Sequence, residues 1–177
     1  MRQPGAKYDY IYAPYYETYV ALVPEADLMA ALSAQRDDFT AFLRGVPEPC
    51  WHVAHAPYTW TFCQAAGHLI DTERIFGYRA LRIARGDTTP LPGFEQDPYV
   101  ANGGFDLRDL PSLADEWDAL RASHVAMFRG LPEAAWGRKG VASNAEVNVA
   151  ALAAMMIGHV RHHGAILRKR LDAVRAG

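Results

Sequence analysis

The chain has 177 residues, of which 50% are hydrophobic and 21% are charged. This length and composition suit one folded domain over residues 1–177 and exclude a disordered chain. The 18 Lys and Arg against 20 Asp and Glu give a formal net charge of −2. We therefore do not expect nucleic acid as a partner.

The sequence does not predict a membrane span or a secretion signal. Its longest purely apolar run, residues 149–157, is too short to span a bilayer. Residues 1–23 are rich in Tyr and Pro and lack the apolar core of a signal peptide. Cys50 and Cys63 form no CxxC pair, which fits a reducing compartment. We expect a cytoplasmic protein that does not act on membranes.

The sequence of residues 1–86 predicts an N-terminal arm followed by two helices. Residues 1–23 hold six closely spaced tyrosines, and we expect an arm along the body, because tyrosine buries its ring while its hydroxyl stays hydrated. Apolar residues at three- and four-residue steps predict a first helix over residues 24–45. Thr61 and Gln64 have the spacing of a capping box and predict the start of a second helix, which ends at Gly86.

The second half predicts a long link and two further helices. Residues 86–111 are rich in Pro and Gly and predict an ordered crossover. A third helix is expected over residues 112–130. A fourth is expected over residues 143–174, with Ser143 and Glu146 as a capping box. We expect no strand. Two short links and one long link favour an all-α four-helix bundle, built from two antiparallel hairpins joined by the crossover.

The motif HVRHH near the C-terminus is the most informative local stretch. His159 and His163 are four residues apart, so a helix places them on one face, at a spacing that lets two imidazoles reach one metal ion. The same stripe is mostly apolar, with Met156 as an example, and continues to Arg170. The alternative is a pair of packed, hydrogen-bonded histidines. His162 lies on the shoulder of the stripe.

A third ligand has to come from another helix. His68 lies on a polar stripe opposite an apolar face, so its ring is expected to face the wall of a cleft. His124 lies on an apolar stripe and is expected to be a hydrogen-bonded core residue or a fourth ligand. Asp71, one turn after His68, is the candidate catalytic acid or base. Its alternative role is to pair with Arg74 or Arg79.

Two reactive side chains of the second helix have other interpretations. Glu73 falls within the apolar face, where a carboxylate has to be paired or neutral. An ion pair with an Arg of another helix is favoured over catalysis. Cys63 lies well off the stripe of His68, and we expect a buried, inert thiol.

Two sequence blocks indicate a family. HLIDTERIFGYRALRIARGD (68–87) and TPLPGFEQDPYV (89–100), together with Trp60 and the HVRHH motif (159–163), resemble the DinB-like superfamily, also called DinB/YfiT. The resemblance covers nearly the whole chain. It implies a four-helix bundle of up-down-down-up topology, which agrees with the bundle inferred from the loop lengths.

The resemblance also implies a metal site and its ligands. That site uses one His of the second helix and two His four apart on the last helix, which here are His68, His159 and His163. The ion is divalent, and zinc, nickel and iron all fit. Relatives include transferases and isomerases that use low-molecular-weight thiols, so a small thiol cosubstrate and a homodimer are implied as well.

Three functions remain open. The first is a metal-dependent enzyme, either a hydrolase or a thiol transferase, acting on a small-molecule substrate with water or a thiolate as nucleophile. The second is a non-catalytic metal-binding or stress-response protein, and the third is a plain bundle without metal. An open coordination position favours the first, and a fourth ligand such as His124 favours the second. Phe94, Tyr99, Gly103 and Gly104 of the crossover are expected to line or cover the cleft.

Overall fold

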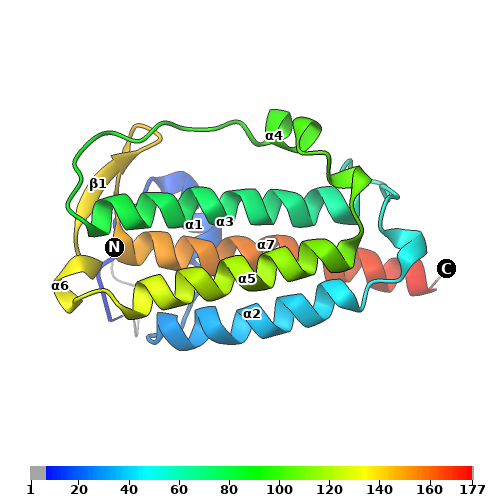
Figure 1. Ribbon diagram of the computed structural model, residues 1–177, viewed down its shortest axis with the longest axis horizontal. Helices are drawn as coiled ribbons and strands as arrows, with labels where there is room; N and C mark the ends of the chain where they lie inside the picture. Colours follow the sequence, from blue (N-terminus) through cyan, green and yellow to red (C-terminus); the bar gives the residue numbers. More distant parts are fainter. Residues whose placement is uncertain (1–6, 177) are drawn as a thin grey trace.

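Four long helices form the body of the protein. In this computed structural model, residues 7–176 are described. Figure 1 shows two of the long helices running from left to right and the other two running back, in the order up-down-down-up. The predicted all-α four-helix bundle is therefore confirmed. The four helices are α2 (Leu28–Arg44), α3 (Phe62–Ala84), α5 (Leu110–Arg129) and α7 (Val149–Ala176).

The helices of the bundle pack in a closed square. Helix α2 contacts α5 and α7, and α3 likewise contacts α5 and α7. Helices α3 and α7 run in opposite directions and pack against each other (Figure 1).

Several helix boundaries agree with the sequence signals. The capping box predicted for α3 is present, because the Gln64 N–H donates to Thr61 Oγ1 (3.1 Å) and the Thr61 N–H donates to Gln64 Oε1 (3.0 Å). Helices α2 and α5 end at Gly45 and Gly130, as the glycines predict.

The predicted starts of the first and third helices were wrong. Helix α2 begins after Asp27, not near Pro24, because Asp27 Oδ1 accepts from the Ala30 N–H (2.9 Å). Helix α5 begins after Asp109, whose Oδ1 accepts from the Ser112 N–H (2.6 Å), so Ser112 lies in the first turn. In both cases an aspartate is the cap, which satisfies a backbone N–H that the helix leaves free.

The segment before α7 is a hairpin, which corrects two predictions. Strands β1 (Lys139–Ala142) and β2 (Ala145–Asn148) pair in antiparallel fashion. Between them, Ser143 and Asn144 have φ values of 52° and 62°, the pattern of a tight two-residue hairpin turn. Ser143 is therefore a turn residue and not the cap of the fourth helix. Asn148 caps α7 instead, by accepting from a first-turn N–H.

The crossover runs along the outside of the bundle (Figure 1). It contains the short helix α4 (Gln96–Asn102) and the single turn η3 (Phe105–Leu107). Near its start, the Leu91 N–H donates to the Val141 carbonyl (2.9 Å), which ties the crossover to the hairpin. The remaining short elements are η1 (Pro14–Tyr16), α1 (Glu17–Val20), η2 (Glu48–Cys50) and α6 (Glu133–Trp136).

The N-terminal arm packs against α7, as α1 contacts that helix. A Cβ at Gly158 would lie 2.0 Å from the Tyr19 carbonyl oxygen, so the close approach of the arm requires glycine at this position. Residues 1–6 of the predicted arm lie outside the described residues. The arm therefore reaches the bundle one residue before His159.

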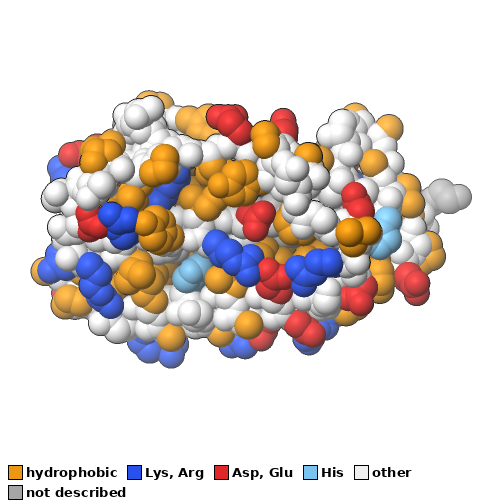
Figure 2. Space-filling model, turned by 45° about the horizontal axis from the view of Figure 1, so that its top comes forward, with side chains coloured by type: hydrophobic (Ala, Val, Ile, Leu, Met, Phe, Trp, Pro, Cys, Tyr) orange, Lys and Arg blue, Asp and Glu red, His pale blue; other side chains and the backbone are white. Residues whose placement is uncertain are grey.

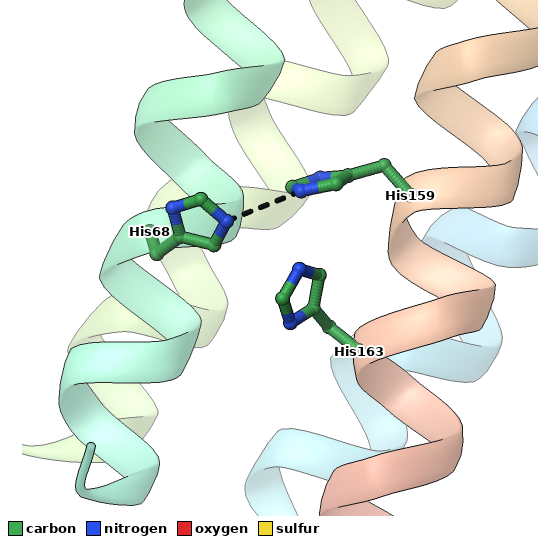
Figure 3. Close-up of side chains that lie close together, drawn as sticks. All are labelled: His68, His159 and His163. Carbon is green, nitrogen blue, oxygen red and sulfur yellow. Dashed lines mark hydrogen bonds between the residues drawn. The ribbon is translucent and has the colours of Figure 1, made fainter. Parts of the chain in front are cut away.

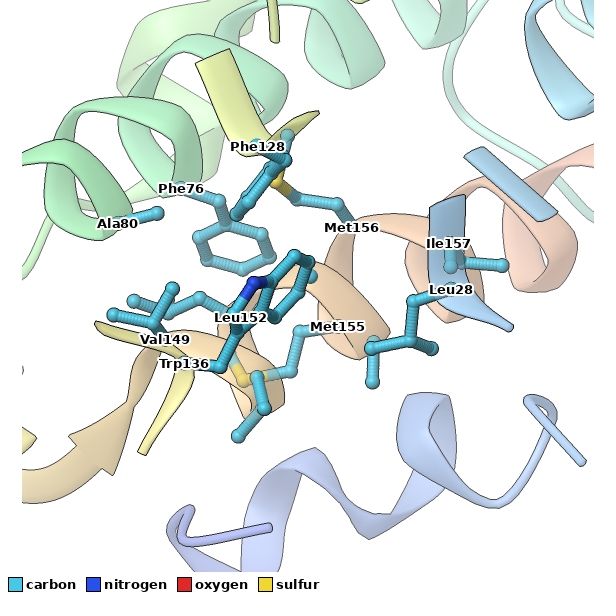
Figure 4. Close-up of a cluster of buried hydrophobic side chains, with 14 of the residues drawn as sticks. Leu28, Phe76, Ala80, Phe128, Trp136, Val149, Leu152, Met155, Met156 and Ile157 are labelled. Carbon is cyan, nitrogen blue, oxygen red and sulfur yellow. The ribbon is translucent and has the colours of Figure 1, made fainter. Parts of the chain in front are cut away.

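The core consists of two apolar clusters with a polar layer between them. Figure 4 shows the cluster near the hairpin, where Phe128 stacks on Trp136 with ring centroids 5.5 Å apart. The second cluster includes Phe39 and Trp117, whose rings meet edge to face at 5.2 Å. On each bundle helix, buried polar residues separate the stretches that join the two clusters: Gln35 on α2, Thr72 and Glu73 on α3, Arg121 on α5 and His159 on α7.

The surface carries charges of both signs. On the face turned forward in Figure 2, Lys and Arg side chains are interspersed with Asp and Glu side chains. Over the described residues, no helix combines the length and the hydrophobicity needed to cross a membrane.

Candidate metal centre

Three histidines from two helices point toward one another (Figure 3). His68 comes from α3, and His159 and His163 come from consecutive turns of α7. The Nε2 atoms of His68 and His159 lie 3.1 Å apart, and one ligand nitrogen from each of the three rings lies within 4.8 Å of the others. Within residues 7–176 this is the only group of three His, Cys, Asp or Glu side chains so placed. The structure brings together the three residues that the sequence singled out.

The spacing of the nitrogens fits a shared ion. Two ligands about 2.0–2.1 Å from zinc are about 3.3–3.4 Å apart at a tetrahedral angle and about 2.9 Å apart at a right angle. The 3.1 Å between the His68 and His159 nitrogens falls between these values. The nitrogens of His68 and His159 can therefore share an ion in either geometry.

Burial keeps the three rings neutral. It lowers the pKa of His68 to about 4 and, together with repulsion from neighbouring histidines, the pKa of His163 to about 3. The pKa of His159 is held well below its ordinary value, first by burial and then by the other imidazoles. Neutral imidazole is the form that binds metals, so near pH 7 the centre needs no deprotonation before it takes up an ion.

Aromatic side chains hold the imidazoles in place. The Tyr19 ring meets the His159 ring edge to face, with centroids 5.0 Å apart. The Trp60 ring lies 4.9 Å from the His68 ring, just before α3 begins. Tyr19 was not singled out from the sequence, where the only signal was the tyrosine-rich arm.

A cavity of about 330 Å³ opens beside the centre. His68 and His159 line it from the bundle, Tyr16 lines it from the arm, and Phe94 and Asp97 line it from the crossover. The arm and the crossover, which are far apart in the sequence, thus form walls of one cavity over the histidines.

His163 lines a second cavity of about 270 Å³, on the side of the loop that precedes α3. Tyr58, Trp60 and Arg170 line it as well. The three histidines are therefore bordered by two separate cavities, and nothing in the sequence predicted the second.

Comparison with known proteins agrees with this geometry. A family model of the DinB superfamily matches residues 31–167. The chain belongs to the DinB superfamily. Among solved structures, this DinB protein is similar to YfiT from Bacillus subtilis, with 14% identity, a TM-score of 0.71 and coverage of 84% of this chain and 86% of that one. YfiT is described as a probable metal-dependent hydrolase with an unusual four-helix bundle topology. At this identity the likeness establishes the fold. No curated protein matches the sequence.

The other crossover residues singled out from the sequence lie elsewhere in this DinB protein. Tyr99 does not line the cavity beside His68. It contacts the Phe94 ring at 5.3 Å and lines a neighbouring cavity. Gly103 and Gly104 form the turn before η3. A Cβ at Gly103 would lie 2.3 Å from the Phe105 ring, and Gly104 has a φ of 64°.

Asp71 lies beside α5 and not in the cavity over the centre. Its carboxylate is 3.8 Å from the Arg74 guanidinium, and burial raises the pKa of Asp71. It is not among the residues that line either cavity at the histidines. Its catalytic role stays a prediction, tested by Asp71→Asn. If Asp71 is a catalytic acid or base, Asp71→Asn should lower kcat at least about a hundredfold. If Asp71 only pairs with Arg74, the substitution should leave kcat unchanged.

Glu73 forms the ion pair predicted for it. Its carboxylate meets the Arg121 guanidinium at 2.8 Å, and both side chains are almost completely buried. His124 joins this pair, with Nδ1 2.9 Å from Glu73 Oε1, and is not part of the histidine group. The Cys63 thiol is buried, which raises its pKa to about 12, so it is not a nucleophile near pH 7.

Proposed function

We propose that this DinB protein is a metal-dependent hydrolase whose centre is one divalent ion held by His68, His159 and His163. The observation that carries the proposal is the convergence of three buried, neutral imidazoles beside a cavity of about 330 Å³. Three neutral ligands leave the charge of the ion uncompensated and leave a coordination position for water or substrate. Such an ion, when bound, would act as a Lewis acid and would lower the pKa of a bound water, so that hydroxide is available as a nucleophile near neutral pH.

The side chains around the centre orient the ligands and restrict access to them. Tyr19 and Trp60 pack against the His159 and His68 rings, so the two imidazoles turn little. Tyr16 of the arm and Phe94 of the crossover both line the cavity. A small molecule fits this space, and we propose neither nucleic acid nor a membrane as the substrate.

A low-molecular-weight thiol transferase is the second candidate. It is favoured by the second cavity at His163, since a transfer reaction brings two molecules to one centre. In that case the thiol, held as its nucleophilic thiolate, and its cosubstrate approach from different sides. Zinc, nickel and iron remain the proposed ions, and a cytoplasmic homodimer is the proposed form. A non-catalytic metal-binding or stress-response role is the alternative that the experiments below separate.

Metal content is the first test. Untagged protein is expected to bind about one divalent ion per chain, measured by mass spectrometry of the metal after gel filtration. His163→Ala should lose the ion. His162→Ala is the matched control, because it removes an adjacent imidazole outside the group and should retain the ion. Failure of the wild-type protein to take up zinc, nickel or iron would overturn the proposal.

Activity is the second test. The loaded protein is assayed on panels of esters, amides and thiol acceptors, with and without added small thiols. Turnover without a thiol supports the hydrolase, and turnover only with a thiol supports the transferase. Stoichiometric metal without turnover on any panel, together with a lower Tm for His163→Ala, would favour the non-catalytic role.

A further inference from the structure

Arg170 of α7 is a buried cation without a counterion. It is 4% exposed, and its Nε and one Nη nitrogen have no hydrogen-bond partner among the described residues. Arg121 on α5 is completely buried, but there the guanidinium is paired with the Glu73 carboxylate. Arginine keeps its charge, so a buried guanidinium needs a hydrogen-bond acceptor. Since the described residues supply none to these two nitrogens of Arg170, the acceptor has to come from outside the chain.

Two cavities border the Arg170 side chain. It lines the cavity of about 270 Å³ that contains Trp60 and His163. It also lines an adjoining outer cavity of about 610 Å³, together with His55 and Lys169. Pro57, Tyr58 and Arg170 line both cavities, which therefore adjoin at Arg170, and the two together are called the Arg170 route below.

The charge of this route is opposite to that of the first cavity. Arg170 and Lys169 are cationic, and no carboxylate lines either part of the route. The cavity at His68, in contrast, is lined by Glu95 and Asp97. An anion is therefore attracted to the Arg170 side of the centre and repelled from the other side.

The surroundings of Arg170 favour a flat anion. Its Cζ atom lies 4.6 Å from the Phe62 ring centre and 5.2 Å from the Tyr58 ring centre, so two aromatic rings flank the guanidinium. A guanidinium held in this way offers two parallel N–H donors, which match the two oxygens of a carboxylate. Arg170 follows His163 by seven residues, about 10 Å along the helix axis, and helical side chains lean toward the N-terminus. A small molecule bound at Arg170 can thus extend toward His163.

We propose that Arg170 binds the carboxylate of a small organic acid in the second cavity, and that the other end of this molecule reaches the histidine centre. The second clause rests on the proposed function, whereas the first does not require a metal. Arg170 is then a substrate-binding residue that selects anionic molecules with an apolar body, since Tyr58, Trp60 and Leu167 line the same space.

Calorimetric titration with benzoate tests the first clause. Full-length protein, as purified and after treatment with EDTA, is expected to bind benzoate saturably in both states. The neutral isostere benzamide should bind at least about tenfold more weakly, because it lacks the charge that pairs with the guanidinium.

Three variants assign the binding to Arg170. Arg170→Met should weaken benzoate binding about tenfold to a hundredfold, and Arg170→Lys should retain part of it. Arg129→Met, which removes one charge from the exposed end of α5, should bind as the wild type does. Equal binding by Arg170→Met, loss of binding with EDTA, or tighter binding of inorganic phosphate than of benzoate would each overturn the proposal.

The link to the centre has its own readout. In cobalt-loaded protein, 3-mercaptopropionate should change the metal spectrum at a concentration at least about tenfold lower than its methyl ester, and Arg170→Met should remove this difference. Equal concentrations for acid and ester in the wild type would overturn the second clause. Absence of metal binding together with Arg170-dependent benzoate binding would overturn the proposed function and that clause, but would support the carboxylate site.

Discussion

Replacement of Glu73 by Gln is expected to lower the free energy of unfolding by about 3–5 kcal/mol. The Arg121 side chain is 0% exposed, with Nε 2.8 Å from Glu73 Oε1 and one Nη nitrogen 2.9 Å from Oε2. Charge centres about 4 Å apart attract each other by about 4 kcal/mol at an effective dielectric constant of about 20. The neutral amide of the variant would forfeit this attraction and leave a guanidinium that cannot lose its proton.

The reverse substitution is expected to cost less. Arg121→Met leaves Glu73 without its cation, but a carboxylate can take up a proton, and His124 Nδ1 lies 2.9 Å from it. The double variant Glu73→Gln/Arg121→Met should be more stable than Glu73→Gln alone, because it leaves no uncompensated charge. A coupling energy of at least about 1 kcal/mol is therefore expected from the double-mutant cycle.

Urea unfolding of the metal-free protein at pH 7 measures these differences. Glu133→Gln is the control, since Glu133 pairs with Lys7 at 3.0 Å while both side chains are more than half exposed. This exposed pair should contribute little to stability, so Glu133→Gln should change the free energy of unfolding much less than Glu73→Gln does. A loss of less than about 1 kcal/mol for Glu73→Gln would refute the reasoning, because the buried layer would then not depend on charge balance.

Three further predictions concern stability. In the folded metal-free protein the pKa of His68 is about 4 and that of His163 about 3, so below about pH 6.5 the unfolded state binds more protons than the folded state. As the pH falls from about 6 to 4, each of these histidines should therefore lower the free energy of unfolding by up to about 1.4 kcal/mol per pH unit, as measured by urea unfolding. Gly158→Ala should destabilise by about 1–3 kcal/mol by displacing the arm, whereas Gly164→Ala on the same helix, with no backbone contact there, should cost less in the same assay. Arg170→Met should raise the free energy of unfolding by about 1–3 kcal/mol, because it removes an unpaired buried charge.

The bundle and its histidines were predictable because their signals are local. A capping box at Thr61 and the glycines after two helices are read within a few residues, and they lie where expected. The four-residue spacing of His159 and His163 fixes their common face on any helix. The pairing of His68 with them is a contact between helices, and the family resemblance, not the periodicity, identified it.

The hairpin before α7 was missed because its signals are not local. Its strands are four residues long, too short for alternation to be recognised, and its turn lacks the usual Asn-Gly pair. Its position depends on distant partners. Leu91 of the crossover bonds to Val141, and a Cβ at Gly140 would lie 2.6 Å from the Ile83 side chain. These contacts exist only once α3 and the crossover are in place.

The partners of the buried charges of Glu73 and Arg170 can be identified only from the structure. Periodicity placed Glu73 within an apolar face, where a pairing was predicted, and placed Arg170 on the stripe of the histidines, where none was predicted. Both charges are buried in the structure, and a buried charge needs a counterion. The counterion of Glu73 is Arg121, within the chain, so the pair is structural. For Arg170 the described residues supply no acceptor to two of its nitrogens, and the side chain lines a cavity next to a metal ligand. A buried charge that is paired within the protein, such as Glu73, therefore has a structural role. A buried charge without a counterion that lines a cavity, such as Arg170, is a candidate for binding a ligand of opposite charge.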